Sequence, residues 1–126
     1  MNSTLLLGTR VVVFALIAYS IAIVTEQKKR QITDAVLSFL TLGIALDVAA
    51  TLLMILGSSN SPFTLHGLIG YSALAAMAID GMLVWRFRLS RPRNWATPLP
   101  LHLYSRYAYL WWVIAFITGG LLAIFK

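Results

Sequence analysis

Residues 63–88, FTLHGLIGYSALAAMAIDGMLVWRFR, decide the fold that the sequence predicts. The stretch is apolar over about 20 residues, the length that an α-helix needs to cross the hydrocarbon core of a bilayer. It nevertheless carries His66 near one end and Asp80 near the other. Fourteen residues make about four helical turns, so both side chains are predicted on one helix face, about 21 Å apart along the axis. A polar side chain at such a position must face the bundle interior or a partner.

Three further apolar runs of similar length occur in the 126-residue chain, which is 60% hydrophobic and 11% charged. A soluble domain of this length needs more charge to cover its surface. Lipid offers the backbone no hydrogen bonds, so runs this apolar must be helices. The sequence predicts an all-α integral membrane protein, a single domain over residues 1–126 that folds as an up-down-up-down four-helix bundle. The predicted helices cover about residues 5–25, 33–57, 63–86 and 101–125.

The connections carry their own signals. Asp34 is predicted to cap the second helix and Gly57 to end it. Residues 86–100 contain three prolines and are predicted to form an extended loop on the cytoplasmic side.

Basic residues are concentrated in two of the three connections. Eight of the ten lysines and arginines lie in the first and third connections, against one at the C-terminus and none in residues 58–62. This positive-inside bias predicts that both termini are external and that the basic connections are cytoplasmic. The expected location is a bacterial or archaeal cell membrane, which the chain crosses several times. Although the net charge is +6, the pattern indicates lipid contacts and no nucleic acid. The side chains assigned to anionic lipid headgroups are Lys28, Lys29, Arg30, Arg86, Arg88, Arg91 and Arg93.

Ionisable residues inside the apolar runs predict buried polar pairs. Arg10 and Asp47 fall at similar depths in the outer half of the bundle, and a long arginine side chain spans the remaining difference. The pair is either purely structural, or Arg10 also holds an anionic group such as a cofactor carboxylate. On the cytoplasmic side, His102 is predicted to bond Asp80, with Arg106 extending the pair. That cluster is either a lock between helix ends or a proton site.

His66 is the residue that favours a cofactor. Dense small residues in the second and third helices indicate either close helix packing or a gap for a flat cofactor. If haem b is bound, His66 is its predicted axial ligand, because Asp80 is a poor ligand for haem iron. The sixth ligand is then Met54, a side chain of a partner subunit, or an open position, and Arg10 would hold a propionate.

Several segments resemble a known family. TLHGLIGYSALAAMAID (64–80) and LHLYSRYAYLWWVIAFITGG (101–120) are similar to the third and fourth helices of the HsmA family of small four-helix membrane proteins. ALDVAATLLM (45–54) and FALIAYSIAIVTEQK (14–28) resemble its second and first helices. The resemblance implies the four-helix architecture, although family members tend to carry a second histidine where this chain has Asp80. More distantly, His66 followed by Gly67 and Gly70 resembles helices of transmembrane b-type cytochromes.

Three function classes stay open. The first is a small membrane protein that binds haem b and acts in electron transfer. The second is an accessory subunit that packs against a larger respiratory or photosynthetic complex, or against copies of itself, with lipid or pigment contacts only. The third is a small transporter or ion pathway through Arg10, Asp47 and Asp80. The sequence contains no nucleophile–base constellation and no phosphate-binding loop, so nothing in it indicates an enzyme.

Overall fold

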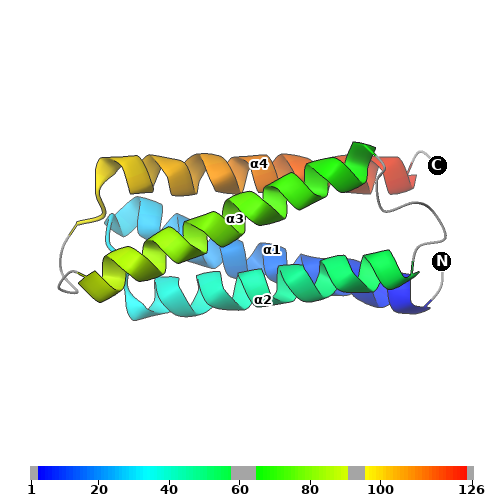
Figure 1. Cartoon of the computed structure of the whole chain (residues 1–126), viewed down its shortest axis with the longest axis horizontal. Coiled ribbons are helices and arrows are strands. Elements are labelled where there is room, and N and C mark those ends of the chain that lie inside the picture. The colour runs from blue at the N-terminus through cyan, green and yellow to red at the C-terminus, as the bar shows by residue number, and fades with distance from the viewer. Residues whose placement is uncertain (1–2, 58–64, 91–95, 125–126) are drawn as a thin grey trace.

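The computed structural model consists of four α-helices packed together: α1 (Ser3–Lys29), α2 (Asp34–Gly57), α3 (Leu65–Ser90) and α4 (Leu99–Ile124) (Figure 1). It describes residues 3–57, 65–90 and 96–124, and the side chains of residues 3–6, 57, 65–67 and 119–124 lie outside the description. Within these ranges there is no strand, and one isolated bridge joins Gln31 and Ala96. The predicted all-α class with four helices is confirmed for this part of the chain.

Two helices extend further than the sequence predicted. α1 continues to Lys29 and α3 to Ser90, each four residues past its predicted end. A helix satisfies its own backbone hydrogen bonds, so it does not have to stop where the apolar run stops. The extension of α1 has a consequence for the interior, because it places Glu26 on the helix and buries it.

The start of α2 differs from the prediction in its cap. α2 begins at Asp34 and ends at Gly57, as expected. The hydroxyl that accepts from the first turn belongs to Thr33, whose Oγ1 lies 3.3 Å from the Val36 backbone nitrogen. Asp34 instead accepts a bond from Arg88 Nη2 on α3 at 2.5 Å. The predicted cap was therefore off by one residue, because the side chain of Asp34 points toward a neighbouring helix.

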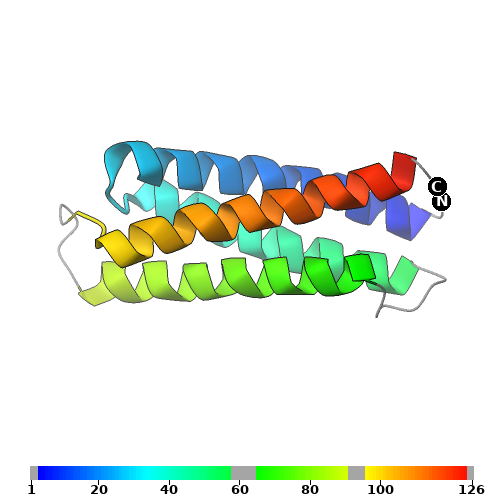
Figure 2. The same ribbon diagram turned by 90° about the horizontal axis from the view of Figure 1, so that it is seen from above.

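The connection from α1 to α2 and the described part of the connection from α3 to α4 meet at one end of the bundle. Arg30 ends α1 with a positive φ of 51°, and its backbone nitrogen donates to the Glu26 carbonyl at 2.6 Å. The Arg30 carbonyl then accepts from the Thr97 backbone nitrogen at 2.9 Å, just before α4. We call this the basic end, because Lys28, Lys29, Arg30, Arg86 and Arg88 lie at it. The start of α1 and the end of α4 lie at the opposite, terminal end (Figure 1 and Figure 2).

Each helix turns one stripe of buried residues toward the others, at intervals of three, four or seven residues. This spacing keeps a single face of a helix in contact with its neighbours. α1 packs most closely along α2, and α3 along α4. The buried residues of these stripes are Gly8, Ala15, Tyr19, Ala22 and Glu26 on α1; Val36, Leu40, Gly43, Asp47 and Ala50 on α2; Ala73, Met77, Asp80 and Val84 on α3; and His102, Ser105, Ala108, Trp112 and Ala115 on α4.

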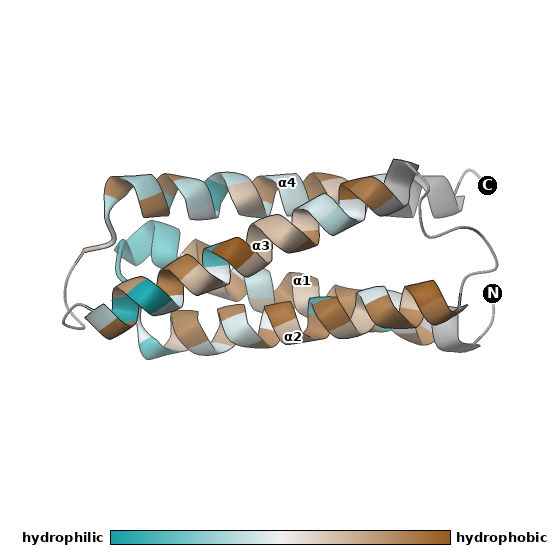
Figure 3. Cartoon of the chain, viewed as in Figure 1, coloured by the Kyte–Doolittle hydropathy of each residue, from teal (hydrophilic) through white to brown (hydrophobic). Residues whose placement is uncertain are grey.

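The bundle is apolar outside and partly polar inside. Large apolar side chains such as Phe14, Leu52 and Met82 are 61%, 55% and 71% exposed, whereas Asp80 is completely buried. Figure 3 shows hydrophilic residues gathered at the basic end of the bundle. Segments of α1, α2 and α3 are each long and apolar enough to cross a membrane: Leu7–Lys29, Asp34–Leu56 and Leu68–Ser90.

Candidate functional site

The polar side chains on the buried stripes, together with Gln27 and Arg106 beside them, lie in three layers along the bundle axis. We call the whole set the polar column. At about 1.5 Å per residue, the first layer is about 4.5 Å from the basic ends of its helices, and the third is about 15–20 Å from them. The first layer contains Glu26, Gln27, His102 and Arg106, the second Asp80 and Ser105, and the third Tyr19, Asp47 and Trp112.

The first layer is a carboxylate–histidine pair held from α1 and α4. Glu26 Oε2 lies 2.8 Å from His102 Nδ1, and both side chains are buried. Gln27 braces the pair, because its amide nitrogen donates to Glu26 Oε1 at 2.7 Å and to the His102 carbonyl at 2.9 Å. Arg106 donates from Nε to Gln27 Oε1 at 2.8 Å, and its Nη2 lies 3.5 Å from His102 Nε2. Since Arg106 is exposed, this layer connects a buried acid to the surface.

The second layer is a buried acid with only half of its hydrogen-bonding capacity used. Ser105 donates to Asp80 Oδ1 across the α3–α4 contact. The other oxygen, Oδ2, has no hydrogen-bond partner among the described residues. Tyr104, the residue directly before Ser105, donates to the Ala76 carbonyl at 2.8 Å and not to Asp80. A buried carboxyl oxygen without a donor is costly, and taking up a proton or a cation is what relieves that cost.

The third layer orients Asp47 with two donors. Tyr19 OH and Trp112 Nε1 both donate to Asp47 Oδ2, at 2.9 and 2.8 Å. The Tyr19 and Trp112 rings meet edge to face, with centroids 4.9 Å apart, and Phe116 stacks on Trp112 at 5.8 Å. Three helices therefore hold this carboxyl, and two neutral donors of fixed position satisfy it.

The predicted Arg10–Asp47 pair is wrong. Asp47 has Tyr19 and Trp112 as its partners, and Arg10 is exposed. Arg10 and Asp47 lie at similar depths along their helices, but Arg10 is on the face of α1 that is turned away from α2. Arg10 follows the buried Gly8 by two residues, which turns it about 200° around α1 and away from the other helices.

The predicted Asp80–His102 pair is also wrong, although both residues are buried near the basic end. His102 bonds Glu26, and Asp80 bonds Ser105. Ser105 lies about one helical turn further from the basic end than His102, which is the level that Asp80 reaches. The expected extension through Arg106 is present, because Arg106 approaches His102 Nε2.

The residues predicted for haem are not assembled in the described part of the structure. His66 belongs to α3, but its side chain lies outside the description. Met54 is half-buried on α2 and packs on α1, where a Cβ built at Gly8 would lie 3.1 Å from Met54 Cγ. Arg10 points away from the bundle interior. Among the described residues no group of three or more histidine, cysteine, aspartate or glutamate side chains is placed to hold a metal ion.

The basic residues assigned to lipid headgroups divide into three sets. Arg88 is bound to Asp34, and Arg30 Nε donates to the Thr97 carbonyl at 3.3 Å. Lys28, Lys29 and Arg86 are exposed at the basic end. Arg91 and Arg93 lie outside the described residues.

Four buried residues of the column were missed by the reasoning from sequence: Glu26, Tyr19, Ser105 and Trp112. Glu26 was placed in a connection because the apolar run ends before it. The signal that finds all four is spacing, because each lies three, four or seven residues from a small or apolar residue of the same buried stripe.

Compared with protein-family models, with curated proteins and with solved structures, the chain has no match. The resemblance to the HsmA family stays a prediction.

Proposed function

We propose that the chain is an integral membrane protein of four transmembrane helices in up-down-up-down order, and that its polar column is the inner half of a proton pathway opening to the cytoplasm. The membrane part is supported by the three long apolar helices and by exposed side chains such as Phe14 and Met82. The orientation is supported by the basic end, because lysine and arginine are retained on the cytoplasmic side.

One observation carries the proton proposal, namely the free Oδ2 of Asp80. No lysine or arginine bonds this carboxyl in the described part of the chain, so a negative charge there has no nearby cation to offset it. A second acid, Glu26, is close enough to interact with it electrostatically. Two buried acids that share one region, of which Asp80 has no bond from a basic side chain, form a site that gains and loses a proton.

A route from the surface to Asp80 follows from the first layer. His102 has Glu26 at one ring nitrogen and Arg106 near the other, so its two nitrogens face the interior and the exposed side respectively. A neutral imidazole carries a proton on one nitrogen and accepts one on the other, which suits it to pass protons between two sides. We infer that protons enter beside the exposed Arg106, whose guanidinium stays protonated, are taken up by His102, and reach Asp80 past Glu26.

The route continues toward the third layer. Tyr19 donates to Asp47 and is near enough to Asp80 to interact with it electrostatically, so it is close to both acids. Beyond Asp47, the buried stripes toward the terminal end consist of small residues in the described part of the chain. Water between these small residues would complete the path. They are Gly8, Ala15, Ala50, Ala73 and Ala115.

The test is proton flux into liposomes. The purified protein is reconstituted with a pH-sensitive dye inside, and a potassium diffusion potential drives protons inward. Asp80→Asn should lose the flux seen with the wild-type protein, because an amide cannot carry the proton. Asp34→Asn is the matched control, since this exposed acid lies outside the column and should leave flux unchanged. Wild-type flux no greater than that of empty liposomes would refute the pathway, as would full flux in Asp80→Asn.

A second candidate, haem binding at His66, is favoured by the register of α3. The helix is continuous from Leu65 to Ser90, so His66 shares the helix position of Ala73 and Asp80, seven and fourteen residues further on. Both of those residues are buried against other helices. Haem would supply electron transfer near the terminal end, whereas the described residues show no assembled second ligand.

An absorption spectrum of the purified protein, oxidised and dithionite-reduced, tests this candidate. A haem spectrum that disappears in His66→Ala and persists in His102→Ala would support it. A protein without haem would leave electron transfer unsupported. If flux were absent as well, the accessory-subunit class would remain.

A further inference from the structure

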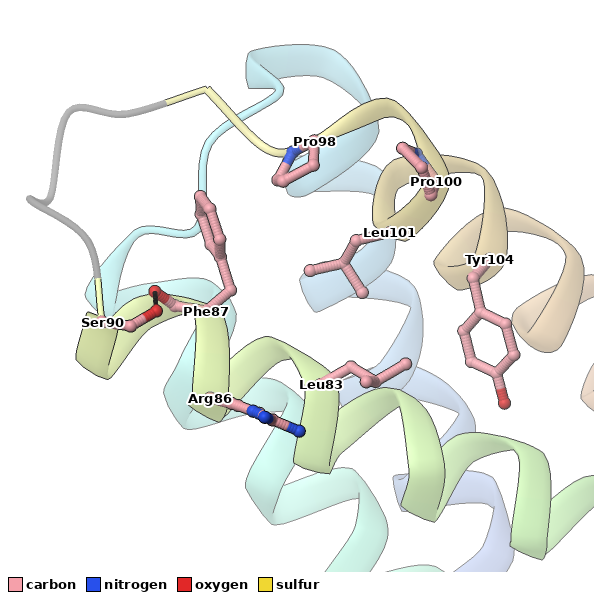
Figure 4. Close-up of a pocket in the computed structure, with 8 residues that line it drawn as sticks. All are labelled: Leu83, Arg86, Phe87, Ser90, Pro98, Pro100, Leu101 and Tyr104. Atoms are coloured by element: carbon pink, nitrogen blue, oxygen red, sulfur yellow. Dashed lines mark hydrogen bonds between the residues drawn. The ribbon is translucent and has the colours of Figure 1, made fainter.

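A groove lies at the basic end, between the last turns of α3 and the first turns of α4 (Figure 4). Its volume is about 510 Å³, within the range of about 300–1,000 Å³ that is usual for ligand sites. The wall is mainly apolar and includes Leu83, Phe87 and Leu101, while Arg86 and Ser90 stand on the α3 side. The groove is separate from the polar column, because no residue of the column lines it and the lining residue Tyr104 donates its hydroxyl to the Ala76 carbonyl.

Arg86 distinguishes this groove from other apolar surface. Its side chain is exposed and has no hydrogen bond or ion pair among the described residues. Neighbouring arginines differ, since Arg88 is held by Asp34 and Arg106 by Gln27. The groove therefore combines an apolar channel with one cationic group that has no partner in the described part of the chain.

We propose that this groove binds one anionic phospholipid, with the headgroup phosphate on Arg86 and an acyl chain along Leu83, Phe87 and Leu101. The charge of Arg86 complements a phosphate that carries no compensating ammonium group, and anionic lipids accumulate in the leaflet that faces basic protein segments. The apolar wall suits a hydrocarbon chain and excludes a small soluble anion as the better ligand. The proposal rests on the membrane placement proposed above and is independent of the proton pathway.

Native mass spectrometry of the detergent-purified protein tests it. Wild-type protein titrated with phosphatidylglycerol should retain one lipid at concentrations where phosphatidylcholine is lost. Arg86→Gln should weaken phosphatidylglycerol binding about fivefold, which corresponds to the roughly 1 kcal/mol that one arginine contributes at a membrane surface. Arg10→Gln is the matched control, because Arg10 is likewise exposed and without a described partner, but lies toward the terminal end and does not line the groove. It should bind as the wild type does.

A second variant tests the acyl part of the site. Leu101→Trp would fill the groove from α4 and should reduce retention of the lipid while leaving the unfolding midpoint in detergent close to that of the wild type. Equal retention of the two lipids, or equal losses in Arg86→Gln and Arg10→Gln, would overturn the proposal in favour of diffuse charge attraction. Competition by millimolar inorganic phosphate would overturn it in favour of a free-anion site. Extraction of the protein from membranes by carbonate alone would instead contradict the membrane placement.

Discussion

Tyr19→Phe is expected to destabilise the protein through the loss of one hydrogen bond to Asp47. The tyrosine is completely buried and its hydroxyl donates to Asp47 Oδ2 at 2.9 Å, while its ring packs on Trp112. Phenylalanine keeps the ring and removes only the donor. Trp112 Nε1 remains as a second donor to the same oxygen, so the carboxyl of Asp47 keeps one of its two hydrogen bonds.

The magnitude follows from two limits. A hydrogen bond to a charged group contributes about 1.5–3 kcal/mol in soluble proteins. Between transmembrane helices, double-mutant cycles give about 0.6 kcal/mol on average and about 1.7 at most. Because one donor to Asp47 survives, we expect the loss to stay within the second range, so Tyr19→Phe should lower the free energy of unfolding by about 0.6–1.7 kcal/mol.

Equilibrium unfolding in mixed micelles, in which sodium dodecyl sulfate is titrated into a mild detergent, measures this loss. The matched experiment repeats Tyr19→Phe in an Asp47→Leu background, where the acceptor is gone. The substitution should then cost at most a few tenths of a kcal/mol, or become favourable, because the hydroxyl has lost its acceptor and phenylalanine removes an unpaired group.

Two results would refute this reasoning. If Tyr19→Phe costs as much without Asp47 as with it, the tyrosine acts through packing alone. If Arg10→Leu proves coupled to Asp47→Leu in the same assay, Arg10 is a partner of Asp47 after all. The structure predicts that Arg10→Leu is additive with Asp47→Leu, since the two side chains face different directions.

Three further predictions concern packing, the first layer and orientation. Gly43→Ala should cost about 1–3 kcal/mol in the same unfolding assay, because the Tyr19 ring occupies the space of the new methyl group, whereas Gly70→Ala should be neutral or stabilising, since nothing lies within 4 Å of its Cβ position. Glu26→Ala should cost about 1–3 kcal/mol by stranding His102, and Glu26→Gln should restore part of the loss; equal losses in both would contradict the hydrogen-bonding role. A reporter enzyme that works only outside the cytoplasm should be active when it is fused after Lys126. Activity there of a reporter that works only inside the cytoplasm would reverse the proposed orientation.

The architecture was largely predictable because it depends on local properties of the chain. The length and apolar character of each run predict a helix whatever its neighbours are, since a helix satisfies its own backbone groups. The end of α2 at Gly57 was also predictable locally, because glycine is common where a helix ends. The ends of α1 and α3 were less accurate, because their last turns are polar and hydropathy measures only the apolar part.

The partners of the buried polar groups were decided only by tertiary structure. Asp47, Asp80 and His102 were correctly predicted to be buried, but the hydrogen-bond partner predicted for each was wrong. Their partners in the structure are Tyr19 and Trp112 for Asp47, Ser105 for Asp80, and Glu26 for His102. Depth along a helix follows from counting residues, whereas the facing partner depends on how each helix is rotated and which helix stands beside it. Those rotations are fixed by packing across the stripes, such as the Tyr19 ring over Gly43. Each residue turns a helix by about 100°, so Arg10, two residues after the buried Gly8, faces outward. On α4 the buried stripe brings Trp112 to Asp47.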